Sequence, residues 1–286
     1  MNLPEIFRRF PTHESCIKHL ETVRWQGKPE CPYCHSTNCT PVPQEMRHHC
    51  NNCNTSFRVT VQTIFHDTKL DLQKWFLAVA LILNAKKGIS SRQLARDLEV
   101  HRNTAWYMGM RIRKAMIQQR ELLQGIAEMD ECYIGGKPRK GSGGPHKRGR
   151  GTSKQPVIGI VERDGKVTAK PVKRTDSKTL SSFVRERVDV DRCKIITDEY
   201  RGYSKLFGFI SHETIDHQVW YVDGDVHTNS IESFWALLKR GIIGQYHKVS
   251  VKHLHEYINE FCYRHNHRKD KTVFDNTILR AVGGEV

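Results

Sequence analysis

Residues 127–134 read Ala-Glu-Met-Asp-Glu-Cys-Tyr-Ile, a mainly apolar run with acidic side chains set into it. Such a run is typical of a strand in a sheet. A second apolar run, residues 193–197, ends directly before Asp198. A strand that carries Asp130 and another that ends in Asp198 can bring these two carboxylates side by side at the edge of one sheet. The sequence therefore predicts a pair of carboxylates that come from distant parts of the chain.

The segments around these two runs predict a domain of strands and helices. Residues 156–162 and 167–172 are expected to form strands, and Asp164-Gly165 between them is a dipeptide typical of a hairpin turn. A helix over residues 178–187 leads to the strand that precedes Asp198. We therefore expect an α/β domain from about residue 121 to the end of the chain.

A third carboxylate, Glu232, lies in a segment expected to be helical, residues 228–241. At about 100° per residue, its apolar side chains form one stripe: Ile231, Phe234, Trp235, Leu238 and Ile242. Asn229, Glu232 and Lys239 follow the flank of this stripe, and Glu232 and Lys239 share a face because they are two turns apart. The alternative interpretation is an ordinary charged rim on an amphipathic helix.

Three carboxylates from separate elements of a basic chain indicate a divalent-metal site. Oxygen ligands suit Mg²⁺ or Mn²⁺. Two such ions about 4 Å apart activate the attacking oxygen and stabilise the leaving oxygen of a phosphodiester. An ammonium at Lys239 is suited to holding a phosphate. Glu131 and Glu199 directly follow the two Asp residues, are expected on the opposite strand face, and rank second as ligands.

Two CxxC pairs predict a structural zinc ion, with the ligands Cys31, Cys34, Cys50 and Cys53. Four thiolates complete a tetrahedron and leave no position for a substrate, so this zinc would support folding rather than catalysis. Cys39, His48 and His49 lie nearby and are expected to be bystanders, and the replacement of one cysteine ligand by one of them stays open. The remaining cysteines, Cys16, Cys132, Cys193 and Cys262, are expected to be buried.

Residues 88–108 predict a helix-turn-helix. Ser90 or Ser91 caps a short helix that carries Leu94, Ala95 and Leu98, and a second helix opens at residue 102 after a turn. The start of the second helix is polar and basic. We expect the start of this helix to contact DNA through Arg102, Asn103 and Thr104. Further along the helix, a basic surface track would continue through Arg111, Arg113 and Lys114. An ordinary helical hairpin with a solvated face is the alternative.

A glycine-rich basic segment follows the strand that holds Asp130. Residues 135–155 contain seven glycines and seven Lys or Arg residues. The segment is expected to form a mobile loop near the carboxylates, whose Lys and Arg side chains could contact the DNA backbone: Lys137, Arg139, Lys147, Arg148 and Arg150. A solvated insertion without a role at DNA is an equally open interpretation.

The composition limits the class of protein. The chain of 286 residues has a formal net charge of +15 and a pI near 9.5, which indicates a polyanionic partner. Nine cysteines, four of them in metal-type spacing, indicate a reducing compartment rather than a disulfide framework. No apolar run has the length of a signal peptide or a membrane span. We expect a soluble cytoplasmic protein, associated with the nucleoid, without a membrane partner.

Several of these motifs together resemble one family, the bacterial insertion-sequence transposases of the DDE class with an N-terminal zinc ribbon. The resemblance covers nearly the whole chain, from about residue 12 to 280, and rests on the CxxC pairs and on four segments: residues 129–137, 197–203, 227–241 and 261–268. It implies a ribonuclease H-like mixed sheet with flanking helices, with Asp130 on the first strand, Asp198 on the fourth and Glu232 on a later helix. In this branch the third ligand can be Asn or Glu, so Asn229 and Glu232 both stay open.

The predicted organisation has four parts: an N-terminal helical segment (1–26), a zinc ribbon (27–66), a helix-turn-helix domain (67–120) and a ribonuclease H-like DDE catalytic domain (121–286). The predicted function is that of a DNA transposase that binds terminal inverted repeats, cleaves with two Mg²⁺ ions and joins 3′-hydroxyl ends to target DNA. Work on two DNA ends implies a homodimer or a larger assembly. Two rivals stay open: a DNA-binding regulator without catalysis, and a nuclease or recombinase that cuts without joining.

Overall fold

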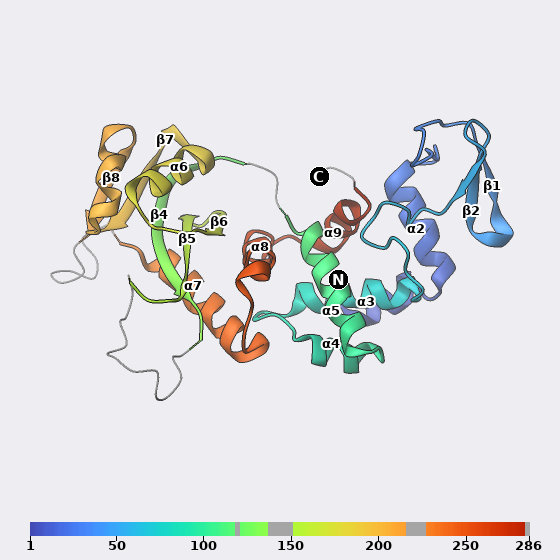
Figure 1. Cartoon of the computed structure of the whole chain (residues 1–286). Helices are drawn as coiled ribbons and strands as arrows, with labels where there is room; N and C mark the ends of the chain where they lie inside the picture. Colours follow the sequence, from blue (N-terminus) through green and yellow to red (C-terminus); the bar gives the residue numbers. More distant parts are fainter. Residues whose placement is uncertain (118–120, 137–150, 216–226, 284–286) are drawn as a thin grey trace. The chain divides into compact units, whose positions relative to one another are not determined.

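The computed structural model describes residues 1–117, 121–136, 151–215 and 227–283, and the chain forms two compact units. Unit 1 comprises Met1–Ile117 and Lys269–Val286, and unit 2 comprises Gln118–Arg268 (Figure 1). Within the described ranges, no helix is long and apolar enough to cross a membrane.

A five-stranded mixed sheet forms the centre of unit 2, with the strand order β6-β5-β4-β7-β8. Its strands are β4 (Leu123–Ile134), β5 (Gln155–Glu162), β6 (Val167–Pro171), β7 (Val188–Asp198) and β8 (Ser211–Ile215). The first three strands pair in antiparallel fashion, whereas β7 runs parallel to β4 and β8 parallel to β7. Three antiparallel strands, continued by two parallel strands beside the first, form a ribonuclease H-like sheet. The predicted fold class is confirmed.

Helices cover both faces of this sheet. Because side chains alternate along a strand, Ala127 and Met129 of β4 share one face, where they pack with Leu180 and Phe183 of α6 (Ser177–Arg187). The other face carries Glu128 and Asp130 and lies against α7 (Asn229–Gly241). The chain then continues through a π-helical turn, Ile242–Tyr246, to α8 (Leu254–Asn266), which packs on β6.

Trp235 of α7 packs directly on the backbone of Gly159 in β5. A Cβ atom added to Gly159 would lie only 2.6 Å from Cη2 of Trp235. Gly159 pairs with Asp130 in the antiparallel ladder. The missing side chain therefore lets α7 approach the sheet beside the first predicted carboxylate.

Most elements of unit 2 match the predicted ones, and the differences concern length and one strand. β4 and β7 begin earlier than expected, at Leu123 and Val188. The edge strand β8 was not predicted because its sequence, Ser-His-Glu-Thr-Ile, is short and mainly polar. Its backbone pairing with β7, from Lys194 onward, makes it a strand.

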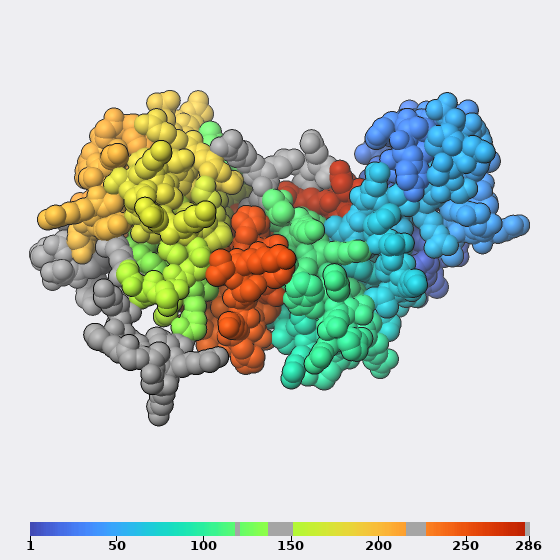
Figure 2. Space-filling view, viewed as in Figure 1, coloured from blue at the N-terminus to red at the C-terminus, as the bar shows by residue number. Residues whose placement is uncertain are grey.

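Unit 1 combines helices with a small three-stranded antiparallel sheet. Its elements are α1 (Leu3–Arg9), α2 (His13–Trp25), β1 (Cys39–Val42), β2 (Arg47–Cys50), β3 (Thr55–Phe57), α3 (Leu72–Asn84), α4 (Ser91–Leu98), α5 (Arg102–Ala115) and α9 (Val273–Ala281). His48 of β2 packs edge-on against Trp25 of α2, and its Nε2 donates a hydrogen bond at 3.0 Å to Oε1 of Glu21. In the space-filling view α2 and the small sheet form one continuous surface (Figure 2).

The last helix belongs to unit 1, which differs from the predicted domain boundaries. We expected residues 121–286 to form one catalytic domain, but Lys269–Val286 group with Met1–Ile117. Phe274 of α9 packs against Phe10 and Phe76, and the backbone N–H of Ile64 donates to the carbonyl of Ala281. The sequence of α9 shows that the helix has an apolar face, but it does not show on which unit that face packs.

Candidate metal centres and nucleic-acid interface

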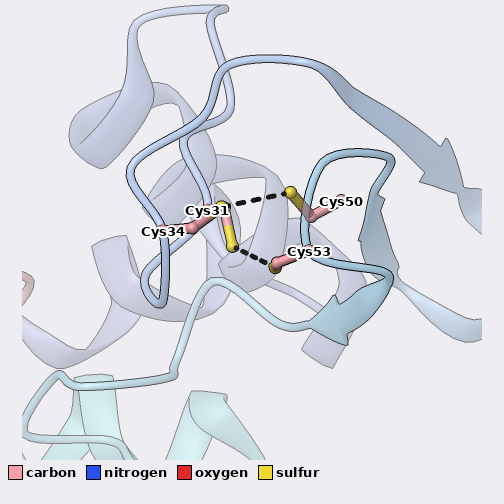
Figure 3. A group of neighbouring side chains, drawn as sticks. All are labelled: Cys31, Cys34, Cys50 and Cys53. Carbon is pink, nitrogen blue, oxygen red and sulfur yellow. Dashed lines mark hydrogen bonds between the residues drawn. The ribbon is translucent and has the colours of Figure 1, made fainter.

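The four predicted zinc ligands converge in unit 1 (Figure 3). All four sulfur atoms lie within 4.8 Å of one another. Sγ of Cys31 is 3.6 Å from Sγ of Cys53, and Sγ of Cys34 is 3.5 Å from Sγ of Cys50. A tetrahedron with Zn–S distances of about 2.3 Å has sulfur separations of about 3.8 Å, so this donor set fits a zinc ion. All four are free thiols.

Short backbone contacts hold the two cysteine pairs in place. In the first loop, the N–H of Cys31 donates to the carbonyl of Ser36 and the N–H of His35 donates back to the carbonyl of Cys31. The second pair lies on the turn between β2 and β3. The backbone N–H of Cys53 donates toward Cys50 and lowers the pKa of the Cys50 thiol, which favours the thiolate form that binds metal.

The three neighbouring side chains that were expected to be bystanders have partners of their own. His48 is bonded to Glu21, His49 lies 3.2 Å from the hydroxyl of Ser56, and Sγ of Cys39 donates to the carbonyl of Ser36. The Cys39 thiol also lies within reach of the Cys50 thiol, so its place outside the zinc site stays a prediction. Cys31, Cys34, Cys50 and Cys53 form the donor set that fits zinc.

The two predicted aspartates of unit 2 lie on one face of adjacent parallel strands. The parallel ladder pairs Glu128 of β4 with Ile196 of β7. Asp130 and Asp198 each lie two residues beyond this pair, and side chains two residues apart share a face. Asp198 also ends β7 and accepts a hydrogen bond at 3.1 Å from the backbone N–H of Tyr200, where the chain turns away.

Electrostatics bring Glu232 into the same cluster. Burial raises the pKa of Asp130 from its ordinary 3.8 to about 7, and the negative charges of Glu131, Asp198 and Glu232 contribute to that rise. Glu232 lies in the first turn of α7, is exposed, and accepts a hydrogen bond at 3.3 Å from the hydroxyl of Thr228. A buried carboxyl whose pKa is raised by neighbouring carboxylates is a group that a bound divalent cation would stabilise in its ionised form.

The carboxylate cluster is more open than the cysteine cluster. Within the part of the chain that the structure describes, the cysteines alone form a group of three or more His, Cys, Asp or Glu side chains whose ligand atoms all lie within 4.8 Å. The carboxylates of Asp130, Asp198 and Glu232 are therefore coupled through charge across a wider space.

Lys239 and Asn229 lie at opposite ends of α7. Burial raises the pKa of the Cys132 thiol, and the ammonium of Lys239 opposes part of that rise, which places Lys239 near Cys132 on β4. Asn229 is the first residue of α7 and is exposed. Its part in the site stays a prediction.

Glu131 is engaged on the other face of the sheet. Its Oε2 accepts a hydrogen bond at 2.7 Å from the hydroxyl of Tyr203. Tyr203 is fully buried in the core that α6 covers. This contact agrees with the expected alternation and ties β4 to the segment after β7.

The prediction overlooked Glu128, which is completely buried beside the start of α7. Its Oε2 accepts hydrogen bonds from the backbone N–H groups of Ser230 and Ile231 at 2.7 and 3.1 Å. The only signal in the sequence is its position two residues before Asp130 in an otherwise apolar run. Its partners, about a hundred residues away, give no local pattern.

The predicted helix-turn-helix is present in unit 1. Ser90 caps α4 by accepting from the backbone N–H of Gln93, Glu99 ends that helix in the left-handed conformation, and α5 begins at Arg102. Arg102 and Asn103 are exposed at the start of α5, and Thr104 is half-buried beside them. These positions are available for contact with DNA.

The basic track along α5 is shorter than expected. Nη1 of Arg111 donates to the backbone carbonyls of Ile64 and His66 at 3.2 and 2.7 Å, which commits this side chain to the fold of unit 1. Arg113 is buried, with 3% of its surface exposed, so the prediction that it extends a surface track is wrong. Lys147 and Arg148, predicted to contact DNA, lie outside the described residues.

Comparison with known proteins identifies the class. Residues 11–56 match the transposase zinc-ribbon domain, and residues 122–266 match the ISXO2-like transposase domain. The second range contains Asp130, Asp198 and Glu232. The protein is an insertion-sequence transposase with an N-terminal zinc ribbon, as its motifs predicted. More narrowly, the chain belongs to the ISXO2-like transposase family.

A protein in transposable element ISH50 of Halobacterium salinarum is 28% identical over 274 residues, which cover 90% of this chain and 92% of that protein. Among solved structures, the pre-cleavage Mos1 transpososome is 12% identical with a TM-score of 0.26 over 74% of this chain and 79% of that one. The Mos1 mariner paired end complex with Mn is 11% identical with a TM-score of 0.23, over 70% and 78%. The fold assignment rests on the strand order and takes nothing from TM-scores this low.

Proposed function

We propose that this transposase cleaves phosphodiester bonds at the ends of its element and joins the released 3′-hydroxyl ends to target DNA. The observations that support this proposal are the position of Asp130 and Asp198 on one face of adjacent parallel strands and the raised pKa of Asp130, which burial causes first and the charges of Glu131, Asp198 and Glu232 increase. An aspartate held in this way disfavours its ionised form and is costly in a protein that only binds DNA. A divalent cation would remove this cost.

Asp130, Asp198 and Glu232 would hold two divalent cations, Mg²⁺ or Mn²⁺, because their oxygen donors suit these hard ions. When bound, the two ions would supply activation of the attacking oxygen and stabilisation of the leaving oxygen. Lys239, on the same helix as Glu232, would hold a phosphate of the DNA. The wide spacing of the carboxylates leaves room for the scissile phosphate among them.

Unit 1 would bind the terminal inverted repeats, through the zinc ribbon and the start of α5. Arg102 and Asn103 would read base edges, for which bidentate Arg and Asn contacts are well suited. The net charge of +15 supports binding to DNA of any sequence. Because two ends must be held together, the active complex would be a homodimer or larger.

The catalytic half is tested by incubating the full chain with Mg²⁺, DNA that carries the ends of its own element, and a target plasmid. Joined products are expected. Asp130→Asn and Asp198→Asn should each lower cleavage and joining by roughly 10³-fold, since the ions supply several kcal/mol of transition-state stabilisation. DNA binding should survive. Glu199→Gln is the matched control and should keep both products.

Two other outcomes would replace the proposal. Cleaved ends without joined products would identify a nuclease, and binding without any cleavage by the unmodified chain would identify a regulator.

The DNA-binding part of the proposal is tested with Arg102→Ala, which should weaken binding to the terminal repeats by roughly 1–3 kcal/mol and relax discrimination between DNA sequences. Equal loss on random DNA would count against base readout at this position.

A further inference from the structure

The start of α7 is held by a side chain of the sheet. An α-helix leaves its first backbone N–H groups without partners inside the helix, and a side chain just before the helix usually accepts from them. Thr228 occupies that position but makes no capping bond. The buried carboxylate of Glu128 on β4 accepts from the N–H groups of Ser230 and Ile231 instead.

Both oxygens of Glu128 are engaged. Oε2 takes the two backbone N–H groups, whereas Oε1 accepts from the hydroxyl of Ser230 at 3.0 Å and from Nε of Arg163 at 3.1 Å. Nη2 of Arg163 also donates to the carbonyl of His227 at 3.3 Å. A carboxylate occupied in this way is a poor candidate for a metal ligand. Its negative charge is favourable at the positive end of a helix.

Glu232 lies between two points at which α7 is fixed to the sheet. Before it, Glu128 holds residues 230 and 231, and after it, Trp235 packs on Gly159, the partner of Asp130. The hydroxyl of Thr228, which does not cap the helix, donates to Glu232. These two contacts, both next to Asp130, therefore fix the position of α7 relative to Asp130.

We propose that Glu128, supported by Arg163, is a positioning residue that fixes Glu232 relative to Asp130 and so sets the affinity of the carboxylate cluster for divalent cations. This inference rests on the proposed function, because it takes these carboxylates as metal ligands. Partners that orient metal ligands typically change metal affinity by about 10- to 100-fold when they are removed.

The experiment measures Mn²⁺ binding to the full chain, by the electron paramagnetic resonance signal of free Mn²⁺, and amide hydrogen exchange at residues 230 and 231. Glu128→Gln keeps the shape of the side chain but loses its charge and one acceptor. We expect the half-saturating Mn²⁺ concentration to rise about 10-fold and exchange at these amides to accelerate. Arg163→Lys keeps the charge without the bridging geometry and should give a rise of about 3-fold.

The matched control is Glu260→Gln. Glu260 of α8 is also completely buried in unit 2. It pairs with Arg264 of α8 and accepts from the hydroxyl of Tyr246, which lies in the turn after α7, away from the start of that helix. Its half-saturating Mn²⁺ concentration should change by less than about 2-fold. An equal rise in both Gln variants would show a general loss of stability and overturn the inference. Unchanged Mn²⁺ affinity in Glu128→Gln and Arg163→Lys would overturn it as well.

Asp130→Asn separates this inference from the function on which it rests. Loss of Mn²⁺ binding in that variant supports the carboxylate metal site, and the Glu128 and Arg163 variants then decide the positioning role. If Asp130→Asn binds Mn²⁺ as well as the unmodified chain, the proposed metal site itself fails. Should Glu128→Gln fail to fold, Arg163→Lys carries the test alone.

Discussion

The thiols of unit 1 come from one short stretch of chain, in which the first and last ligands are 22 residues apart. The carboxylates of unit 2 come from two strands and a helix, and the contact that anchors the helix joins residues 102 apart. The thiols close to 3.5 and 3.6 Å, whereas the carboxylates stay wider apart and raise the pKa of Asp130. A local site can close completely and support folding. A site assembled from distant elements depends on how those elements pack.

The largest effect is expected for the four-cysteine cluster of unit 1. Cys31→Ser or Cys53→Ser removes a thiolate from a cluster whose zinc supplies on the order of 10 kcal/mol of folding free energy in small domains. We expect the zinc content to fall from about one per chain to near zero and residues 27–66 to unfold, with weaker binding to DNA ends. Unit 2 should keep its unfolding transition. Zinc analysis and limited proteolysis measure these changes.

Cys39→Ser is the matched control for this comparison, because Cys39 lies beside the cluster and donates to the carbonyl of Ser36. It should keep its zinc. Loss of zinc from this variant, or full zinc in Cys31→Ser, would show that the cluster is not made of the four cysteines named here.

The next effect decides the third ligand of the assembled site. Glu232→Gln should lower cleavage by roughly 10³-fold, since Glu232 brings a charge that a second cation needs and acts on Asp130. Asn229→Ala should retain measurable cleavage. The rate of cleavage of end DNA with Mg²⁺ measures both. The reverse result, an active Glu232→Gln and an inactive Asn229→Ala, would make Asn229 the ligand and Glu232 a rim residue.

The raised pKa of Asp130 predicts that the free energy of unfolding depends on pH. The folded-state pKa of Asp130, about 7, lies above its ordinary 3.8. The folded unit therefore binds more protons than the unfolded chain between these values, and the free energy of unfolding falls as pH rises through them. Asp130→Asn removes this loss. In buffer without divalent cations, we expect the variant to be more stable by roughly 2–4 kcal/mol at pH 8.

Urea unfolding of both proteins at pH 5 and pH 8 measures this difference, which should be smaller at pH 5 because the carboxyl is then mostly protonated in the folded state. A variant that is less stable at pH 8, or a difference that does not change with pH, would contradict the electrostatic cost. The zinc content should be equal in both proteins.

The smallest change tests whether packing controls the assembled site. Gly159→Ala places a methyl group 2.6 Å from the indole ring of Trp235, so this side chain or α7 itself must shift. Overpacking of this kind costs roughly 1–3 kcal/mol of stability, and cleavage should weaken because Glu232 moves with the helix. Gly208→Ala is the control, since a Cβ there meets nothing within 4 Å. Unaltered stability and cleavage in Gly159→Ala would mean that α7 is not held by this contact.

Much of unit 2 was predictable because its patterns are local. The apolar stripe from Ile231 to Leu238 predicted α7, and short apolar runs predicted the strands β4 to β7, because buried helices and strands leave apolar patterns in their own segments. Glu128, β8 and the placement of α9 were not predictable. Glu128 and the residues of β8 are polar, and their partners lie in other segments of the chain. The apolar face of α9 does not identify the unit on which this helix packs.

The sequence by itself predicted the four cysteines that converge and the start of α5 at Arg102, since each depends on a short stretch of chain. The roles of Asp130, Asp198 and Glu232 as metal ligands stay predictions. Tertiary structure alone decided that Arg111 and Arg113 serve the fold, that Glu128 holds α7, and that the charges of Asp198 and Glu232 act on Asp130. These outcomes depend on strand pairing and on a helix packed against Gly159. Both involve contacts between segments far apart in the chain, and neither imposes a period or a spacing on any single segment.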